Sequence, residues 1–158
     1  MAMDNITFIN PGNDIQDARI GIVCSRFNRF IVERLQEACI EQLVSAGIHR
    51  ENITLVQVPG AFEIPVAVQR VLNKRDCDAV ITLGAVIRGE TPHFEYIASE
   101  CARGIAGLAL ENDVPVIFGV LTVDNREQAE QRAGTEESNK GAESARAALH
   151  MISIMRRI

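Results

Sequence analysis

The chain has 158 residues and 47% of them are hydrophobic, enough to fill one core, so we expect a single domain over residues 1–158. Its net charge of −5 and lack of a basic stripe argue against nucleic-acid binding and favour small-molecule ligands. The four cysteines are scattered among apolar neighbours, and no apolar run has the length of a signal peptide or a membrane span. We therefore expect reduced thiols, no structural metal and a cytoplasmic location.

The first segment, residues 1–12, is predicted to be an N-terminal arm. Ile6 and Phe8 alternate there with polar residues ahead of Pro11 and Gly12, as in a strand outside the main sheet. Two interpretations stay open, because such an arm can pair with a neighbouring subunit or simply fray. We expect the first.

Apolar runs then alternate with segments of helical periodicity, which is typical of βαβ units. The strands are expected at 18–24, 53–58, 79–87 and 116–123, and the helices at 30–46, 64–73, 94–110, 126–132 and 141–156. Thr91 and Pro92 are expected to cap the third helix and to occupy its first turn. Right-handed crossovers then predict an α/β fold, a three-layer αβα sandwich with a flavodoxin-like, four-stranded parallel sheet.

Ligands of such sheets bind beyond the carboxyl ends of the strands, so the loops that follow the strands are the candidate site. Phe27 follows the first strand and Phe62 the second, where either ring can stack on a flat heterocycle or merely cap the core. Glu63 begins a helix, where it can offset the helix dipole or hydrogen-bond a polar ligand. The sequence leaves both pairs of alternatives open.

His93 is the candidate proton-transfer residue. In the first turn of the third helix, the helix dipole disfavours imidazolium and keeps a neutral ring that can exchange protons. Backbone N–H groups around Glu90 and Thr91 offer an anion site at the same helix start. A lone histidine is often structural, but His49 and His150 lack a comparable setting.

Other chemistries find little support in the sequence. Residues 134–141 resemble a phosphate-binding P-loop only superficially, because Asn139 stands where that motif needs glycine. Lys74 ends a helix at the edge opposite the expected site, which argues against a lysine Schiff base. Arg132 and Lys140 can hold a phosphate or simply be solvated at helix ends. Arg132 ends a helix away from the strand-end loops of its own subunit, so it would more easily reach the site of an adjacent subunit. A role for Arg132 in the site therefore indicates an oligomer.

Several segments spread along nearly the whole chain carry a resemblance to a known family. They are Arg26-Phe27-Asn28, GAFEIP at 60–65, GAVIRGETPHFEY at 84–96, FGVLT at 118–122, QRAGT at 131–135 and NKGAE at 139–143. Together they resemble the lumazine synthase family, and the long third motif is the most specific of them. The resemblance implies condensation of 5-amino-6-(D-ribitylamino)uracil with 3,4-dihydroxy-2-butanone 4-phosphate to 6,7-dimethyl-8-ribityllumazine, phosphate and water, without cofactor or metal.

The resemblance also implies roles for individual residues. His93 would assist imine formation and later proton transfers, and Arg132 would clamp the phosphate. Phe27 would stack near the pyrimidine, while Glu90 and Thr91 would receive the ketone phosphate. The ring and the ribityl chain would be held by Ala61, Phe62, Glu63, Ala85, Val86 and Ile87, and a neighbouring subunit would supply Phe118, Arg132 and Lys140.

Members of the family form homopentamers or icosahedral shells of twelve pentamers, and the short connection over 132–143 resembles the shell-forming members. The resemblance also implies riboflavin synthase as a partner that such a shell can enclose. No motif in this sequence indicates whether it binds. One departure is Glu136-Glu137-Ser138, where many relatives carry Lys-Ala-Gly, which reduces the positive charge near the phosphate loop.

Three alternatives remain: a module that binds a flavin or lumazine, a container protein without turnover, and an archaeal-type riboflavin synthase. The presence of His93 and Arg132 argues against the first, and the match to the long third motif argues against the last.

Overall fold

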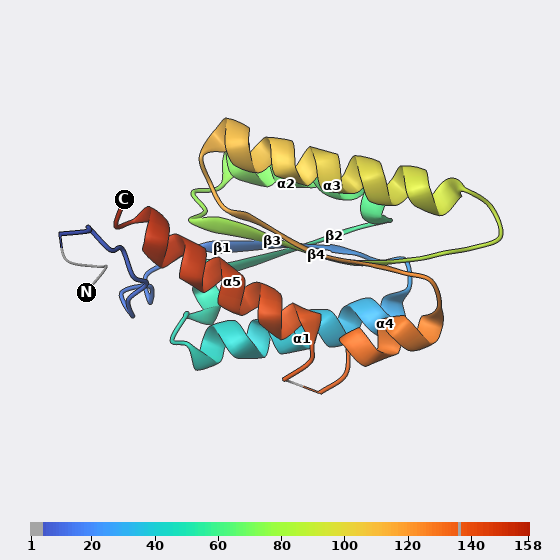
Figure 1. Ribbon diagram of the computed structural model, residues 1–158, viewed down its shortest axis with the longest axis horizontal. Helices are drawn as coiled ribbons and strands as arrows, with labels where there is room; N and C mark the ends of the chain where they lie inside the picture. The colour runs from blue at the N-terminus through green and yellow to red at the C-terminus, as the bar shows by residue number, and fades with distance from the viewer. Residues whose placement is uncertain (1–4, 136) are drawn as a thin grey trace.

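Four parallel strands form the sheet of the computed structural model, which describes residues 5–135 and 137–158 (Figure 1). Their order is β2-β1-β3-β4, as expected for a flavodoxin-like sheet. The strands are β1 (Ile20–Ser25), β2 (Ile53–Val58), β3 (Ala79–Ile87) and β4 (Val116–Val123). Three of them have the predicted bounds, and β1 begins two residues later and ends one residue later than predicted.

Helices cover both faces of the sheet, which confirms the predicted three layers (Figure 1). On one face lie α1 (Arg29–Ser45), α4 (Arg126–Arg132) and α5 (Lys140–Met155). The other face is covered by α2 (Ile64–Lys74) and α3 (His93–Asn112). Two short 3-10 helices, η1 (Arg50–Asn52) and η2 (Ala61–Glu63), flank β2. The chain thus changes faces between β1 and β3, and ligands of doubly wound sheets bind at such a switch point.

The two central strands are buried, whereas each outer strand exposes two of its side chains. Every residue of β1 is buried, and so is every residue of β3 except Ile87, because helices cover both of their faces. At the edges, Leu55 of β2 and Phe118 of β4 stay 40% and 44% exposed. Edge strand β4 is therefore partly open to solvent.

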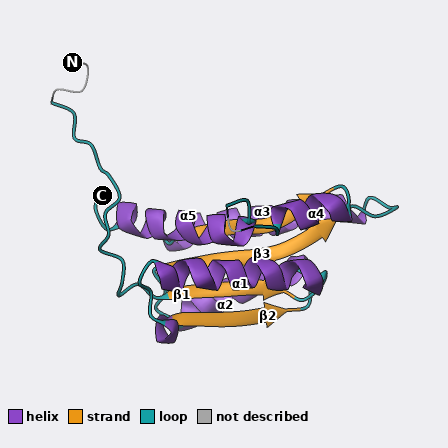
Figure 2. Cartoon of the chain, turned by 90° about the horizontal axis from the view of Figure 1, so that it is seen from below, coloured by secondary structure: helices purple, strands orange, loops and turns teal. Residues whose placement is uncertain are grey.

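Two local expectations differ from the structure. The residue before α3 is Pro92 itself, which takes the N-cap position, and no side-chain cap bond forms there, so Thr91 is not the cap. The fixed φ of proline suits this flanking position as well as the first turn. Residues 5–12 join no strand of the sheet, and Figure 2 shows this segment running away from the layers beside the C-terminus.

The N-terminal arm is therefore not part of the chain's own sheet. Its first four residues lie outside the described residues, and Ile6 and Phe8 are exposed in the rest. The arm is tied to the last helix where the N–H of Gly12 donates to Ser153 Oγ at 2.7 Å. Its pairing with a neighbouring subunit stays a prediction. Over the described ranges, no helix is long and apolar enough to cross a membrane.

Candidate active site

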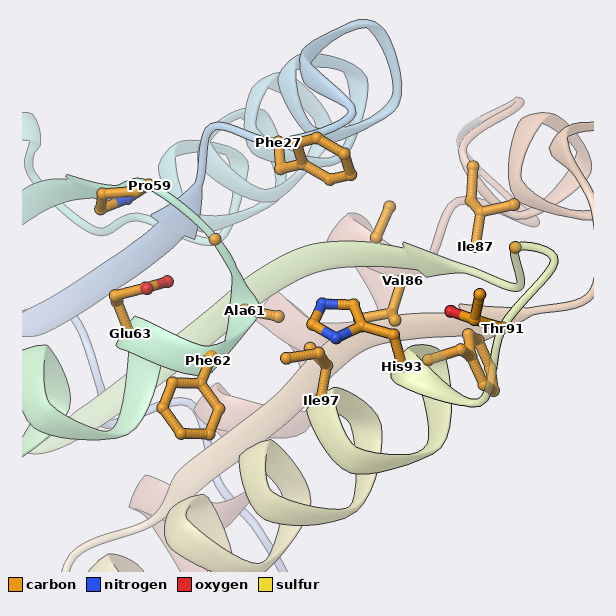
Figure 3. Close-up of a pocket in the computed structure, with 14 residues that line it drawn as sticks. Phe27, Pro59, Ala61, Phe62, Glu63, Val86, Ile87, Thr91, His93 and Ile97 are labelled. Carbon is orange, nitrogen blue, oxygen red and sulfur yellow. The ribbon is translucent and has the colours of Figure 1, made fainter.

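A cavity of about 750 Å³, here called the first cavity, opens beyond the carboxyl ends of β1, β2 and β3 (Figure 3). It lies where the loops after these three strands meet the start of α3. Its walls are formed by Phe27, Pro59, Gly60, Ala61, Phe62, Glu63, Ala85, Val86, Ile87, Gly89, Thr91, His93, Phe94 and Ile97. The first cavity thus occupies the switch point at which the sheet topology predicts a ligand.

Phe27 borders the first cavity from the loop after β1, where the backbone is held on two sides. Its N–H donates to the carbonyl of Pro59 at 3.0 Å. The next residue, Asn28, adopts a left-handed φ of 58°, which asparagine tolerates better than most residues, and its side chain donates to the carbonyl of Ala85 at 2.8 Å. Phe27 stays 72% exposed, so its ring is available to a ligand and does not cap the core.

The η2 segment supplies the second wall. Pro65 lies in the first turn of α2, which starts directly after η2. The ring of Phe62 is 57% exposed, so it does not cap the core either. Glu63 is half-buried, and a Cβ at Gly60 would lie 3.1 Å from its Oε2, so the carboxylate folds back over the glycine beside the first cavity. Both candidate roles of Glu63 are compatible with this place.

His93 is the first residue of α3 and reaches into the space between η2 and the end of β3 (Figure 3). Its ring is exposed, at the positive end of the helix dipole. Thr91 also lines the first cavity, whereas Glu90 does not. Because Pro92 has no N–H, the first two residues of α3, His93 and Phe94, supply the free backbone donors of the helix itself. The anion site around Glu90 and Thr91 stays a prediction.

The remaining predicted residues lie elsewhere. Phe118, Arg132 and Lys140 line a separate second cavity of about 250 Å³ against edge strand β4. There Arg132 donates to the carbonyl of Gln128 at 3.0 Å, and Lys140 Nζ lies 2.6 Å from Glu143 Oε2. Within the described chain, the phosphate-binding candidates thus face a different cavity from His93. Of the acidic loop, Glu136 lies outside the described residues.

Several residues of the first cavity were not among the predicted ones: Pro59, Gly60, Gly89, Phe94 and Ile97. For two of them a signal exists, because Phe94 and Ile97 follow His93 by one and four residues, which places Ile97 on the same helix face as His93. Pro59 and Gly60 belong to the loop after β2, where position beyond a strand is the only signal. The same positional signal applies to Gly89, which lies in the loop after β3.

Comparison with known proteins shows the family of the chain. A family model described as 6,7-dimethyl-8-ribityllumazine synthase matches residues 17–156, which include every strand and all residues of both cavities. The 6,7-dimethyl-8-ribityllumazine synthase of Halorhodospira halophila (strain DSM 244 / SL1) is 50% identical over 144 residues, covering 91% of this chain and 92% of that protein. The chain therefore belongs to the 6,7-dimethyl-8-ribityllumazine synthase family.

Proposed function

We propose that the first cavity is the site at which this chain condenses 5-amino-6-(D-ribitylamino)uracil with 3,4-dihydroxy-2-butanone 4-phosphate to 6,7-dimethyl-8-ribityllumazine, releasing phosphate and water. The reaction is that of its family, and it makes the chain a transferase of the penultimate step of riboflavin synthesis. One observation carries the site assignment: three strand ends bring Phe27, Phe62 and His93 to the wall of one cavity.

The chemistry of the residues suits this reaction. The amine of the substrate is itself the nucleophile, so the protein needs to supply orientation, proton transfer and charge stabilisation. The exposed rings of Phe27 and Phe62 offer flat surfaces to the pyrimidine. Glu63 can accept hydrogen bonds from the polar substrate. His93, the first residue of α3 and part of the wall of the first cavity, is placed to relay protons during imine formation and phosphate loss.

The phosphate of the second substrate requires positive charge that the first cavity does not supply. Among the described residues that line this cavity there is no lysine or arginine, and Glu63 is acidic. The second cavity has both kinds of cation, Arg132 and Lys140. We therefore propose that the second cavity of a neighbouring subunit closes the first, with Arg132 gripping the phosphate through its planar guanidinium.

This arrangement makes a homo-oligomer necessary for activity. We propose homopentamers, as the resemblance to the family implies, and a shell of twelve of them, because the short connection between α4 and α5 resembles that of the shell-forming members. Light scattering coupled to size-exclusion chromatography measures the mass directly. A 17.4 kDa monomer as the only active species would contradict the shared site.

The function is tested by mixing the purified protein with both substrates and following the absorbance and fluorescence of the lumazine against the uncatalysed reaction. His93→Ala is compared with His150→Ala. His150→Ala removes an exposed imidazole from α5, none of whose residues lines the first cavity. We expect acceleration by the wild type and by His150→Ala, and a loss of about hundredfold to ten-thousandfold in kcat for His93→Ala. Tight lumazine binding without acceleration would instead indicate a binding module.

Arg132 has a separate test in the same assay. Arg132→Ala is expected to raise the KM for the ketone phosphate, because a charge-assisted contact to phosphate is lost, while the KM for the aminouracil stays near that of the wild type. Unchanged kinetics towards the ketone phosphate would refute the assignment.

A further inference from the structure

Arg88 is the first residue after β3 and stands between two strand ends and the start of α3. Its N–H donates to the carbonyl of Val123 at 2.9 Å, so the pairing of β3 with β4 continues one residue beyond β3. This bond fixes the backbone of Arg88 at the mouth of the first cavity. Its side chain is then free to reach the neighbouring segments.

The guanidinium of Arg88 makes three contacts to two of those segments. Nε lies 3.0 Å from Asp124 Oδ1, directly after β4. Nη1 lies 3.4 Å from Glu95 Oε1, and Cζ lies 4.5 Å from the centre of the Phe94 ring, both in the first turn of α3. The end of the sheet is thereby connected to the two residues that follow His93.

The start of α3 has few other anchors. Its N-cap residue, Pro92, makes no side-chain cap bond. The loop before it is exposed, and a Cβ at Gly89 would meet nothing within 4 Å. The direction in which His93 points therefore depends on how the first helical turn is held, and Arg88 holds the next two residues of that turn.

A single exposed ion pair contributes little, since solvent screens it and two long side chains lose freedom. Arg88 differs because its three contacts converge on one planar group, which can bind carboxylates along its edges while an aromatic ring covers its face. Phe94, the ring in question, also lines the first cavity. A shift of this ring would change the cavity wall beside His93.

We propose that Arg88 is a positioning residue for proton transfer: it fixes the first turn of α3 and thereby holds His93 towards the substrate, without touching the substrate itself. This inference rests on the proposed function. Two ion pairs carry the inference: Arg88 pairs with Asp124, 36 positions away, and with Glu95, 7 positions away. Arg88 thereby orders a loop that is otherwise exposed to solvent.

The test compares Arg88→Gln and Arg88→Lys with Arg126→Gln. Arg126 is a matched control, because it also stacks on a phenylalanine, Phe30 at 4.2 Å, and pairs with Glu130 at 2.8 Å, on the opposite face of the sheet. Since misplacement by 1 Å can cost about a hundredfold, we expect Arg88→Gln to lower kcat about tenfold, with both KM values changed less than about twofold. Arg88→Lys should recover part of the loss, and Arg126→Gln should keep the kcat of the wild type.

A double substitution shows whether Arg88 acts through His93. In a His93→Ala background, Arg88→Gln should cause no further loss of kcat, because residues that act as a unit are not additive. The same tenfold loss in both backgrounds, or an unchanged kcat in Arg88→Gln alone, would overturn the inference.

Amide hydrogen exchange supplies a readout that does not need turnover. Exchange across residues 88–97 should be faster in Arg88→Gln than in the wild type and in Arg126→Gln. If the wild type failed to accelerate the condensation, the proposed function would fail, while this measurement would still decide whether Arg88 orders the start of α3. Unchanged exchange across 88–97 would overturn that role.

Discussion

The guanidinium of Arg156 lies 2.9 Å from the carboxylate of Asp17, although 139 positions separate the two residues. The same guanidinium donates to the carbonyl of Asp14 at 2.7 Å and lies 3.5 Å from Asp78 Oδ1. Arg156 thereby connects the end of the last helix to the segment before β1 and to the turn before β3. This set of contacts is here called the clasp. The segment that follows the N-terminal arm is thus joined to the end of the last helix.

The clasp should weaken in acid. The hydrogen bond from Arg156, followed by its positive charge, holds the pKa of Asp17 below its ordinary value of 3.8. A lowered carboxylate pKa contributes stability that is present above the unfolded pKa of about 3.9 and is lost as the pH falls through the folded value. Asp17→Asn should therefore have a lower urea midpoint than the wild type at pH 6, and this difference should shrink as the pH falls below the unfolded pKa of about 3.9.

The size of the effect should be small, because Asp17 is exposed and solvent screens the pair. Asp76→Asn, at another exposed aspartate near the same turn, is the control and should show no such pH-dependent difference. A difference between Asp17→Asn and the wild type that stays constant down to about pH 2 would argue against the ion pair as its cause.

Gly141 allows α5 to approach α1 closely. A Cβ built on Gly141 would overlap the backbone carbonyl of Leu35, which cannot move without distorting α1. Overpacking of a core typically costs about 1–3 kcal/mol and occasionally more. Gly141→Ala should therefore lower the free energy of unfolding by about 1–3 kcal/mol or more. Gly107→Ala is the matched control on α3, where a Cβ meets nothing within 4 Å, and it should stabilise by about 0.5–1 kcal/mol. Equal unfolding midpoints for the two variants would refute the close approach.

Much of the sheet can be predicted from the sequence because buried parallel strands are continuous apolar runs. The run that forms β3 shows this, since both its ends agree with the prediction. The loops after the strands are predictable for a related reason, because topology alone brings Phe27 and Phe62 to one edge. What a periodic pattern does not encode is local backbone and side-chain geometry. The left-handed Asn28 and the convergence of Asp124 and Glu95 on Arg88 depend on contacts between segments that only the fold brings together.

The resemblance to the family predicted more residues of the candidate site than the spacing of residues along the chain did. Arg132 and Lys140 are ordinary surface cations by pattern, and the structure of one chain brings them to a different cavity from His93. No property of a single sequence says which surfaces of two copies meet. The proposal of a shared site therefore concerns how subunits assemble, and it is tested by an experiment on the oligomer.

The cysteines should differ sharply in reactivity. Burial raises the pKa of the thiols of Cys24 and Cys39 to about 12 and that of Cys101 to about 11, so all three stay protonated at pH 8. Cys77 is only half-buried, and its pKa is raised as well, first by burial and then by the nearby Asp78 and Asp76. A thiol reagent at pH 8 should therefore label Cys77 first in the native protein and all four after denaturation. Cys77→Ser should remove the first labelling phase, and its persistence in that variant would contradict the assignment.

The shared site can be tested by mixing subunits that are each defective in a different half. In a ring, each chain offers its first cavity to one neighbour and its second cavity to the other. His93→Ala and Arg132→Ala homo-oligomers are expected to be impaired. Hybrids assembled from equal amounts of the two should regain activity, because about one quarter of their sites would combine an intact His93 with an intact Arg132 of the neighbour.

A mixture of wild type with the double variant His93→Ala/Arg132→Ala calibrates this experiment, because it contains the same number of intact side chains in a different arrangement. If the site is shared, random assembly leaves about one quarter of its sites intact as well, so both mixtures should have equal activity. If one chain supplied both residues, the calibrating mixture would keep about one half of the wild-type activity and the first mixture would regain none. The ratio of the two activities therefore decides between a site within one chain and a site between chains, whatever the size of the assembly.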